Sequence, residues 1–115
     1  MIVKNKSLVT SEIVWELVKR EIYGYEKIDG ILDTFNNCRE TGLMFSSFNG
    51  TIHIWVFAHR NTDEITVVYG DINDSNNMFN EEEYDNKVRF GYDYEEAAYF
   101  VSNLLKKNVE ENENA

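Results

Sequence analysis

The chain has 115 residues, 21 acidic and 11 basic side chains, and a formal charge of −10. This length predicts one domain, residues 1–115, with a core of its own. The acidic surplus disfavours direct binding to nucleic acid or to an anionic membrane. The single cysteine excludes an intramolecular disulfide, and no apolar run has the ~18 residues of a membrane span. We therefore expect a cytoplasmic protein.

The first third of the chain predicts helices. Thr10-Ser11 provides an N-cap, and apolar residues at three- and four-residue spacing predict an amphipathic helix over residues 11–23. Residues 1–9 are interpreted as a short edge strand or a loosely held arm. A short second helix is expected within residues 26–37. Asn36-Asn37 and then Glu40-Thr41-Gly42 mark the turn into a sheet.

Residues 43–71 predict three consecutive antiparallel strands. Asn49-Gly50 separates the first two, and this pair is the strongest short hairpin signal because a type I′ turn needs positive φ at both positions. Residues 61–64 supply the second turn. After a polar, acidic loop, the alternating residues 87–92 predict a fourth strand or an edge segment.

The central strand, residues 51–59, is apolar on both faces. Ile54 and Val56 point to one face, and Trp55 and Phe57 point to the other. A solvated meander usually has one polar face. Two interpretations follow: helices cover both faces, or one face is partly covered and serves as an interaction surface.

The C-terminal part predicts another helix. Asp93 and Glu96 have nearly the spacing of a capping box, so the helix is expected over residues 94–108, followed by a frayed tail over residues 109–115. The predicted fold class is therefore α+β: an antiparallel three- to four-stranded meander with an N-terminal helix, with or without a second short helix, and a C-terminal helix.

No motif predicts catalysis, a cofactor or a metal site. His53 and His59 lie on one strand about 20 Å apart, too far to share a metal ion. Residues 71–82 match part of a calcium-loop pattern, but Asn76 replaces the usual glycine and a strand precedes the loop. We therefore expect a protein that is not an enzyme and binds neither cofactor nor metal.

The negative charge lies in the second half of the chain. Residues 1–60 hold seven acids and seven bases, whereas residues 61–115 hold fourteen acids and four bases. A nucleic-acid-binding groove is lined with Lys and Arg, so a small acidic domain can occupy it; interleaved aromatic side chains would serve as anchors. The predicted partner-binding residues are Asp71, Asp74, Phe79, Glu81, Glu82, Glu83, Tyr84, Asp85, Tyr92 and Tyr94.

This organisation, with an Asn-Gly meander between helices and the stretch FNEEEYDN, resembles the small inhibitors encoded by phages and mobile elements. Among these inhibitors, the organisation most resembles that of DNA-mimicking anti-CRISPR proteins. The resemblance implies a non-enzymatic inhibitor, in the host cytoplasm if a phage encodes it, that binds the basic surface of a nucleic-acid-binding protein such as a CRISPR effector nuclease.

Two alternatives stay open. An immunity protein or antitoxin that neutralises a toxic nuclease would have the same electrostatics. A housekeeping α+β interaction domain would be acidic for solubility alone, and its apolar sheet face would then be free to dimerise. Both a monomer and a homodimer are therefore compatible with the sequence.

Overall fold

The computed structural model of the chain describes residues 5–32, 35–46, 52–72 and 75–113. Its elements are, in order, α1 (Lys6–Ile22), α2 (Ile28–Leu32), β1 (Phe35–Arg39), β2 (Gly42–Ser46), β3 (Ile52–Ala58), β4 (Ile65–Asp71), the 3-10 helices η1 (Ser75–Asn77) and η2 (Glu81–Glu83), β5 (Asn86–Arg89) and α3 (Tyr94–Glu113). Among these residues, no helix combines the length and apolar composition needed to cross a bilayer.

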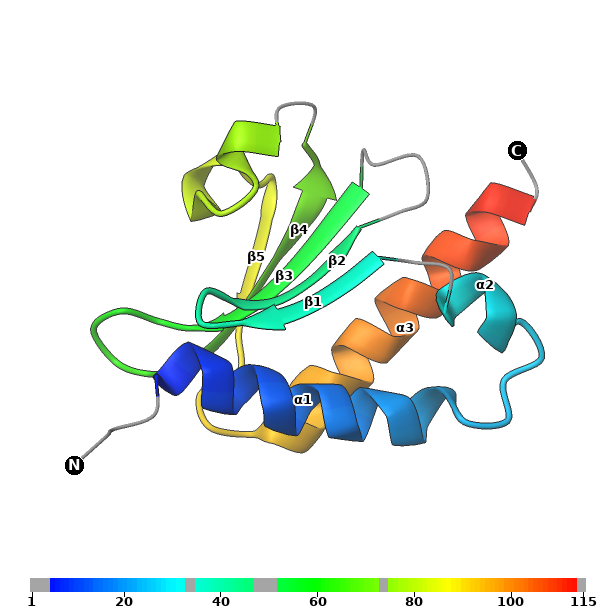
Figure 1. Ribbon diagram of the computed structural model, residues 1–115, viewed down its shortest axis with the longest axis horizontal. Helices are drawn as coiled ribbons and strands as arrows, with labels where there is room; N and C mark the ends of the chain where they lie inside the picture. The colour runs from blue at the N-terminus through cyan, green and yellow to red at the C-terminus, as the bar shows by residue number, and fades with distance from the viewer. Residues whose placement is uncertain (1–4, 33–34, 47–51, 73–74, 114–115) are drawn as a thin grey trace.

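The strands form one five-stranded antiparallel sheet in the order β1-β2-β3-β4-β5 (Figure 1). The predicted α+β meander is confirmed. The predicted turn at Asn49-Gly50 lies outside the described residues, but the flanking strands pair antiparallel with Ser46 opposite His53. The fourth predicted strand forms as β5 and ends earlier than expected, at Arg89, before a turn in which Gly91 has a φ of 61°.

The N-terminus of α1 differs from the prediction. The Asn5 side-chain oxygen accepts hydrogen bonds from the backbone N–H groups of Ser7 (2.8 Å) and Leu8 (3.2 Å), so Asn5 is the N-cap. Thr10 and Ser11 are buried inside the helix. The predicted N-cap at Thr10-Ser11 is wrong, because asparagine caps helices as well as serine does and Asn5 comes first. The strand or loose arm predicted for residues 1–9 is also wrong for residues 6–9, which belong to α1.

An unpredicted strand, β1, forms one edge of the sheet. The chain continues extended through Asn36 and Asn37, which were expected to begin the turn into the sheet. It turns at Glu40 and Thr41, the later of the two predicted turn positions. Gly42 then begins β2 with a φ of 118°, and a Cβ at this position would clash with the backbone of β3. Glycine is therefore required at this hairpin.

Helix α3 continues past the predicted end at residue 108, so the expected frayed tail is wrong as far as residue 113. Two contacts with the N-terminal part of the chain explain this. Val109 is buried, and a Cβ on Gly30 of α2 would lie 3.0 Å from its Cγ1. The Tyr25 hydroxyl donates to the Glu110 carboxylate at 2.6 Å.

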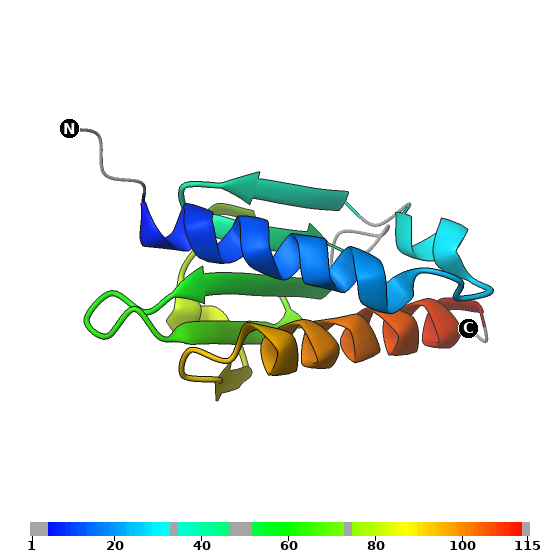
Figure 2. The ribbon, with the colours of Figure 1, turned by 90° about the horizontal axis from the view of Figure 1, so that it is seen from below.

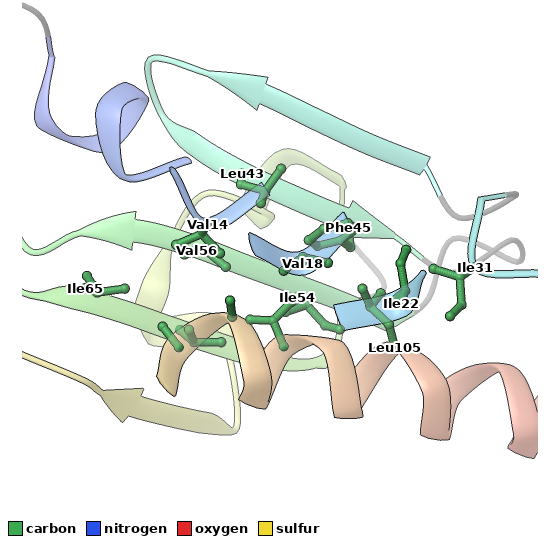
Figure 3. Packing of buried hydrophobic residues seen from close by; sticks show 14 of the residues in the cluster. Val14, Val18, Ile22, Ile31, Leu43, Phe45, Ile54, Val56, Ile65 and Leu105 are labelled. Atoms are coloured by element: carbon green, nitrogen blue, oxygen red, sulfur yellow. The ribbon is translucent and has the colours of Figure 1, made fainter. Parts of the chain in front are cut away.

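The main core lies between the sheet and the helices (Figures 2 and 3). Apolar side chains of α1 and α3 recur every three or four residues and meet the alternate residues of β2, β3 and β4. The labelled members in Figure 3 are Val14, Val18, Ile22, Ile31, Leu43, Phe45, Ile54, Val56, Ile65 and Leu105.

The opposite face of the sheet is covered by a segment that we call the cap, consisting of Ile72 and residues 75–85. The cap packs on the second apolar cluster, in which Trp55 and Phe57 are only 8% and 6% exposed. The expectation of helices on both faces is therefore wrong. The side chains of Trp55 and Phe57, which the dimerisation alternative would use, are largely covered by the cap.

Candidate partner-binding surface

Tyr84 attaches the cap to the sheet. Its side chain is 7% exposed, and its hydroxyl donates to the backbone carbonyl of Met78 at 2.6 Å. The ring lies 6.3 Å from that of Trp55. Burial raises the pKa of the Tyr84 hydroxyl well above its ordinary value. The ring of Tyr84, which was predicted to contact a partner, is thus packed inside the protein and leaves little of its surface for such a contact.

The acidic side chains of the cap lie around this anchor. Glu81 forms an ion pair with Lys87 of β5 at 3.3 Å. Glu82, Glu83 and Asp85 are exposed and form no ion pair among the residues that the structure describes. The Asn80 side chain caps the short turn by accepting from the Glu82 N–H at 3.2 Å. Three unpaired carboxylates are thus held next to a buried residue.

A groove of about 630 Å³ lies beside the cap, and we call it the aromatic groove. Trp55 and Phe57 stack in it with ring centroids 4.1 Å apart, and the Trp55 indole N–H donates to the Thr41 carbonyl at 2.8 Å. Phe79 of the cap meets Trp55 edge-on at 5.6 Å and is 42% exposed. The polar residues that line the aromatic groove are Ser7, Thr41, His59, Arg60, Asn61, Asn80, Glu81 and Glu82.

A smaller hollow of about 260 Å³, which we call the edge pocket, lies between the sheet and the second half of α3. Pairing of β4 with β5 places Tyr69 opposite Asn86, and a Cβ on Gly70 would lie 3.5 Å from the backbone nitrogen of Asp85. Asp71 and Asp85 therefore come to the same hollow. Its lining is completed by Ile52, Ile54, Leu104, Lys107, Asn108 and Glu111.

The predicted residues are only partly brought together. Phe79, Glu81 and Glu82 line the aromatic groove, whereas Asp71 and Asp85 line the edge pocket. Glu83 lies on the cap between these two sets and lines neither hollow. Asp74 lies outside the described residues.

The last two predicted residues lie elsewhere. Tyr92 is exposed and its hydroxyl donates to the Thr62 carbonyl in the β3–β4 turn at 2.7 Å. Tyr94, in the first turn of α3, is half-buried against the main core. Neither residue lines the aromatic groove or the edge pocket. They are separate from the surface formed by the cap.

The acidic residues of the second half do not form one continuous surface. Glu95, Glu96 and Glu110 belong to α3, which covers the face of the sheet opposite the cap (Figure 2). The negative charge is therefore divided between two sides of the molecule. On the cap, Glu81 and Glu82 line the same groove as the partly exposed Phe79.

The two histidines are bound within the fold. His53 is buried and its Nδ1 lies 2.6 Å from the Ser46 hydroxyl oxygen, while His59 Nε2 lies 3.0 Å from the Arg89 guanidinium. In the described ranges, no three His, Cys, Asp or Glu side chains are grouped so as to hold a metal ion.

Most lining residues of the two hollows were not among the predicted site residues, and Trp55 and Asn108 are examples. Trp55 was expected on a sheet face that either helices or a partner would cover, and Asn108 was expected to end a helix. The signal for Asn108 was its position on α3, three residues after Leu105 and seven after Val101, which places it on the buried stripe.

Comparisons with protein-family models, with curated proteins and with solved structures found no match to the chain. Function is therefore inferred from the cap and the two hollows beside it.

Proposed function

We propose that the protein is a non-enzymatic inhibitor that binds the basic nucleic-acid-binding surface of a partner protein, as the anti-CRISPR proteins that it resembles do. The observation that supports this most directly is the exposure of Glu82, Glu83 and Asp85 beside the buried anchor Tyr84. These three carboxylates form no ion pair within the described ranges and are available to Lys and Arg side chains of a partner.

The attachment of the cap favours binding. Charges on a fixed segment lose less conformational entropy on association than charges on a flexible tail. The hydrogen bond from Tyr84 to Met78 and the one from the Glu82 N–H to the Asn80 side chain fix the cap on both sides of Glu82. Such a surface complements a groove that is built for phosphate groups.

The aromatic groove supplies the apolar part of the proposed contact. Phe79 is partly exposed beside Trp55, and Glu81 and Glu82 lie on the same wall. Aromatic side chains dominate binding energy at interfaces, whereas exposed charges mainly set the association rate. The partly exposed ring of Phe79 also attracts the cationic side chains that the carboxylates would recruit.

Partner capture with a matched pair of variants tests this function. The cap variant is Glu82→Gln/Glu83→Gln/Asp85→Asn. The control variant carries three acid-to-amide changes on the helix side of the molecule, Glu21→Gln/Glu26→Gln/Glu95→Gln. Both lose the same formal charge. Proteins captured from a host lysate are eluted with duplex DNA, and their association rates with parent and variants are measured at low and high salt.

We expect the cap variant to associate about tenfold more slowly at low salt and the control variant to associate nearly as fast as the parent. The free energy of unfolding of the cap variant should change by less than about 0.5 kcal/mol, since the three side chains are exposed. Equal slowing of both variants would mean that net charge, and not the cap, governs association. A captured protein that duplex DNA cannot displace would also contradict the proposal.

A further inference from the structure

The outer side of strand β1, which we call the open edge, is an unpaired edge of the sheet. Among the described residues, only β2 pairs with β1 (Phe35–Arg39), and Figure 2 shows β1 at the margin of the sheet. An edge strand presents backbone N–H and C=O groups to which another strand can bind. The open edge is therefore a place where the sheet can gain a further strand.

The registers of the sheet show which backbone groups of β1 point outward. In an antiparallel pair, residues that exchange hydrogen bonds with one neighbouring strand alternate with residues whose bonds point to the other side. The His59 N–H donates to the Glu64 carbonyl at 2.8 Å, so β3 bonds to β4 at odd positions and to β2 at even positions. Counting on through β2 and β1 leaves the N–H and C=O groups of Asn36 and Cys38 directed away from β2.

The opposite edge of the sheet is protected in a way that the open edge is not. Strand β5 has four residues and carries Lys87 and Arg89 at alternate positions. Charged side chains of this kind are a common means of preventing strand addition. The sequence of β1, FNNCR, has one charged residue, which is the last of the strand. Strand addition is therefore expected at β1 and not at β5.

The distribution of charge favours a second copy of the chain at the open edge. A formal charge of −10 makes two copies repel each other, but residues 1–60, which form α1, α2 and the first three strands, hold seven acids and seven bases. The acidic half forms β4 and β5, at the far side of the sheet from β1, and the cap and α3. Two copies that meet along β1 bring their neutral halves together and keep their acidic halves apart.

Aromatic surface lies near the same edge. Trp15 of α1 is half-buried and packs on Phe45, with ring centroids 5.7 Å apart. Phe45 is the residue of β2 that pairs with Asn36 of β1. Association along β1 can bury more of this apolar surface, which would add to the backbone hydrogen bonds between the two strands.

We propose that two copies of the chain associate through β1 as a symmetric antiparallel pair and join their five-stranded sheets into one. The symmetric register that uses the outward groups places Asn37 opposite its own counterpart and Asn36 opposite the counterpart of Cys38. The two-fold axis is then perpendicular to the sheet, so both caps lie on one face and both α1 helices lie on the other. The dimer does not depend on the proposed function, but it would present two acidic caps to a partner.

Sedimentation velocity of the full chain, over a range of concentrations and with a reducing agent present, tests the dimer. We expect a dissociation constant on the order of 10 μM at physiological salt, since a pair of five-residue strands buries a small interface. Cys38→Pro removes an outward N–H and should weaken association by about tenfold or more, whereas Cys38→Ala keeps that N–H and should associate like the parent. Both variants should unfold at nearly the same urea concentration, because an edge strand tolerates proline where the N–H faces solvent.

Cysteine cross-linking tests the register. Asn37→Cys/Cys38→Ala places one thiol per chain at the two-fold axis, where opposed Cα atoms that exchange no hydrogen bonds lie about 4.5 Å apart, within the range of a disulfide. Asn36→Cys/Cys38→Ala is the matched control, because its two thiols would not be opposite each other. Under mild oxidation, we expect the first variant to form a covalent dimer about tenfold faster than the control.

The proposal is overturned if the parent sediments as a monomer at about 0.5 mM, if Cys38→Pro and Cys38→Ala associate alike, or if the two cysteine variants cross-link at the same rate. Its failure is distinguishable from failure of the proposed function, because these measurements involve no partner. Salt also separates the two. Screening weakens the attraction between the cap and a basic partner, but it reduces the repulsion between two acidic copies, so the dimer should persist as the salt concentration rises.

Discussion

The two faces of the sheet are covered in different ways. On one face, α1 and α3 contribute side chains at regular helical spacing, and the buried cluster extends along both helices. On the other face, the cap contributes few apolar side chains, chiefly Ile72, Met78 and Tyr84, from a segment with only short 3-10 turns. The helical side thus depends on many repeated contacts, whereas the cap depends on a few individual ones. The residues Glu82, Glu83 and Asp85, which are proposed to bind a partner, lie on the side of the sheet that the cap covers.

The largest effect is expected on the helical side. Leu105→Ala removes a side chain that is 1% exposed, and we expect a loss of about 3 kcal/mol in the free energy of unfolding, because the cavity left in a packed core adds to the lost burial. Urea denaturation measures it. The matched change Leu104→Ala, at a half-buried position of the same helix, should cost less. Equal losses would mean that the helix does not pack as described.

A smaller effect is expected in the cap. Tyr84→Phe removes the donor to the Met78 carbonyl and should cost about 1–2 kcal/mol at pH 7. A loss as large as that of Leu105→Ala would show that the cap belongs to the same cooperative core. Amide hydrogen exchange of residues 75–85 provides a second measurement, since a detached cap would lose protection while the helices keep theirs.

The effect of Tyr84→Phe on the free energy of unfolding is expected to depend on pH. The pKa of Tyr84 is raised by burial in the folded protein, whereas an unfolded tyrosine ionises near pH 10. Above about pH 10 the unfolded state releases a proton that the folded state retains, so the contribution of Tyr84 to stability falls as the pH rises. The difference in stability between the parent and Tyr84→Phe should therefore narrow from pH 8 to pH 11. A constant difference would contradict this.

The smallest effect is expected at the rim of the cap. Lys87→Gln removes the ion pair with Glu81, whose two side chains are 38% and 32% exposed. Solvent screens such a pair, so we expect a loss of about 0.5 kcal/mol or less that disappears at high salt. Thermal unfolding at two ionic strengths measures it. A larger loss would show that this pair, and not Tyr84, holds the cap.

The sheet could be predicted because its signals are local. Alternation of Ile54 and Val56 with Trp55 and Phe57 predicted two apolar faces, and both are buried. What covers the second face could not be predicted. The cap residues that belong to the buried apolar cluster are six positions apart, at 72, 78 and 84, and this spacing matches neither a helix nor a strand.

The remaining differences have a similar cause. Strand β1 has the sequence FNNCR, whose asparagines disfavour strands, and it forms because β2 pairs with it. Tyr84 stands in an acidic run, where sequence does not tell whether a ring turns inward. Partner-binding residues chosen by composition therefore included one core residue, while Asn108, on the buried stripe of α3, was not chosen.

The two tryptophans lie on opposite sides of the sheet. Trp15 of α1 contacts Phe45, with ring centroids 5.7 Å apart, on the helical side, and Trp55 contacts Phe57 under the cap. The protein thus carries one tryptophan on each side of the sheet. Single-tryptophan versions, Trp15→Phe and Trp55→Phe, would report separately on solvent entry into each layer, so loosening of the cap could be observed optically while the helices stay folded.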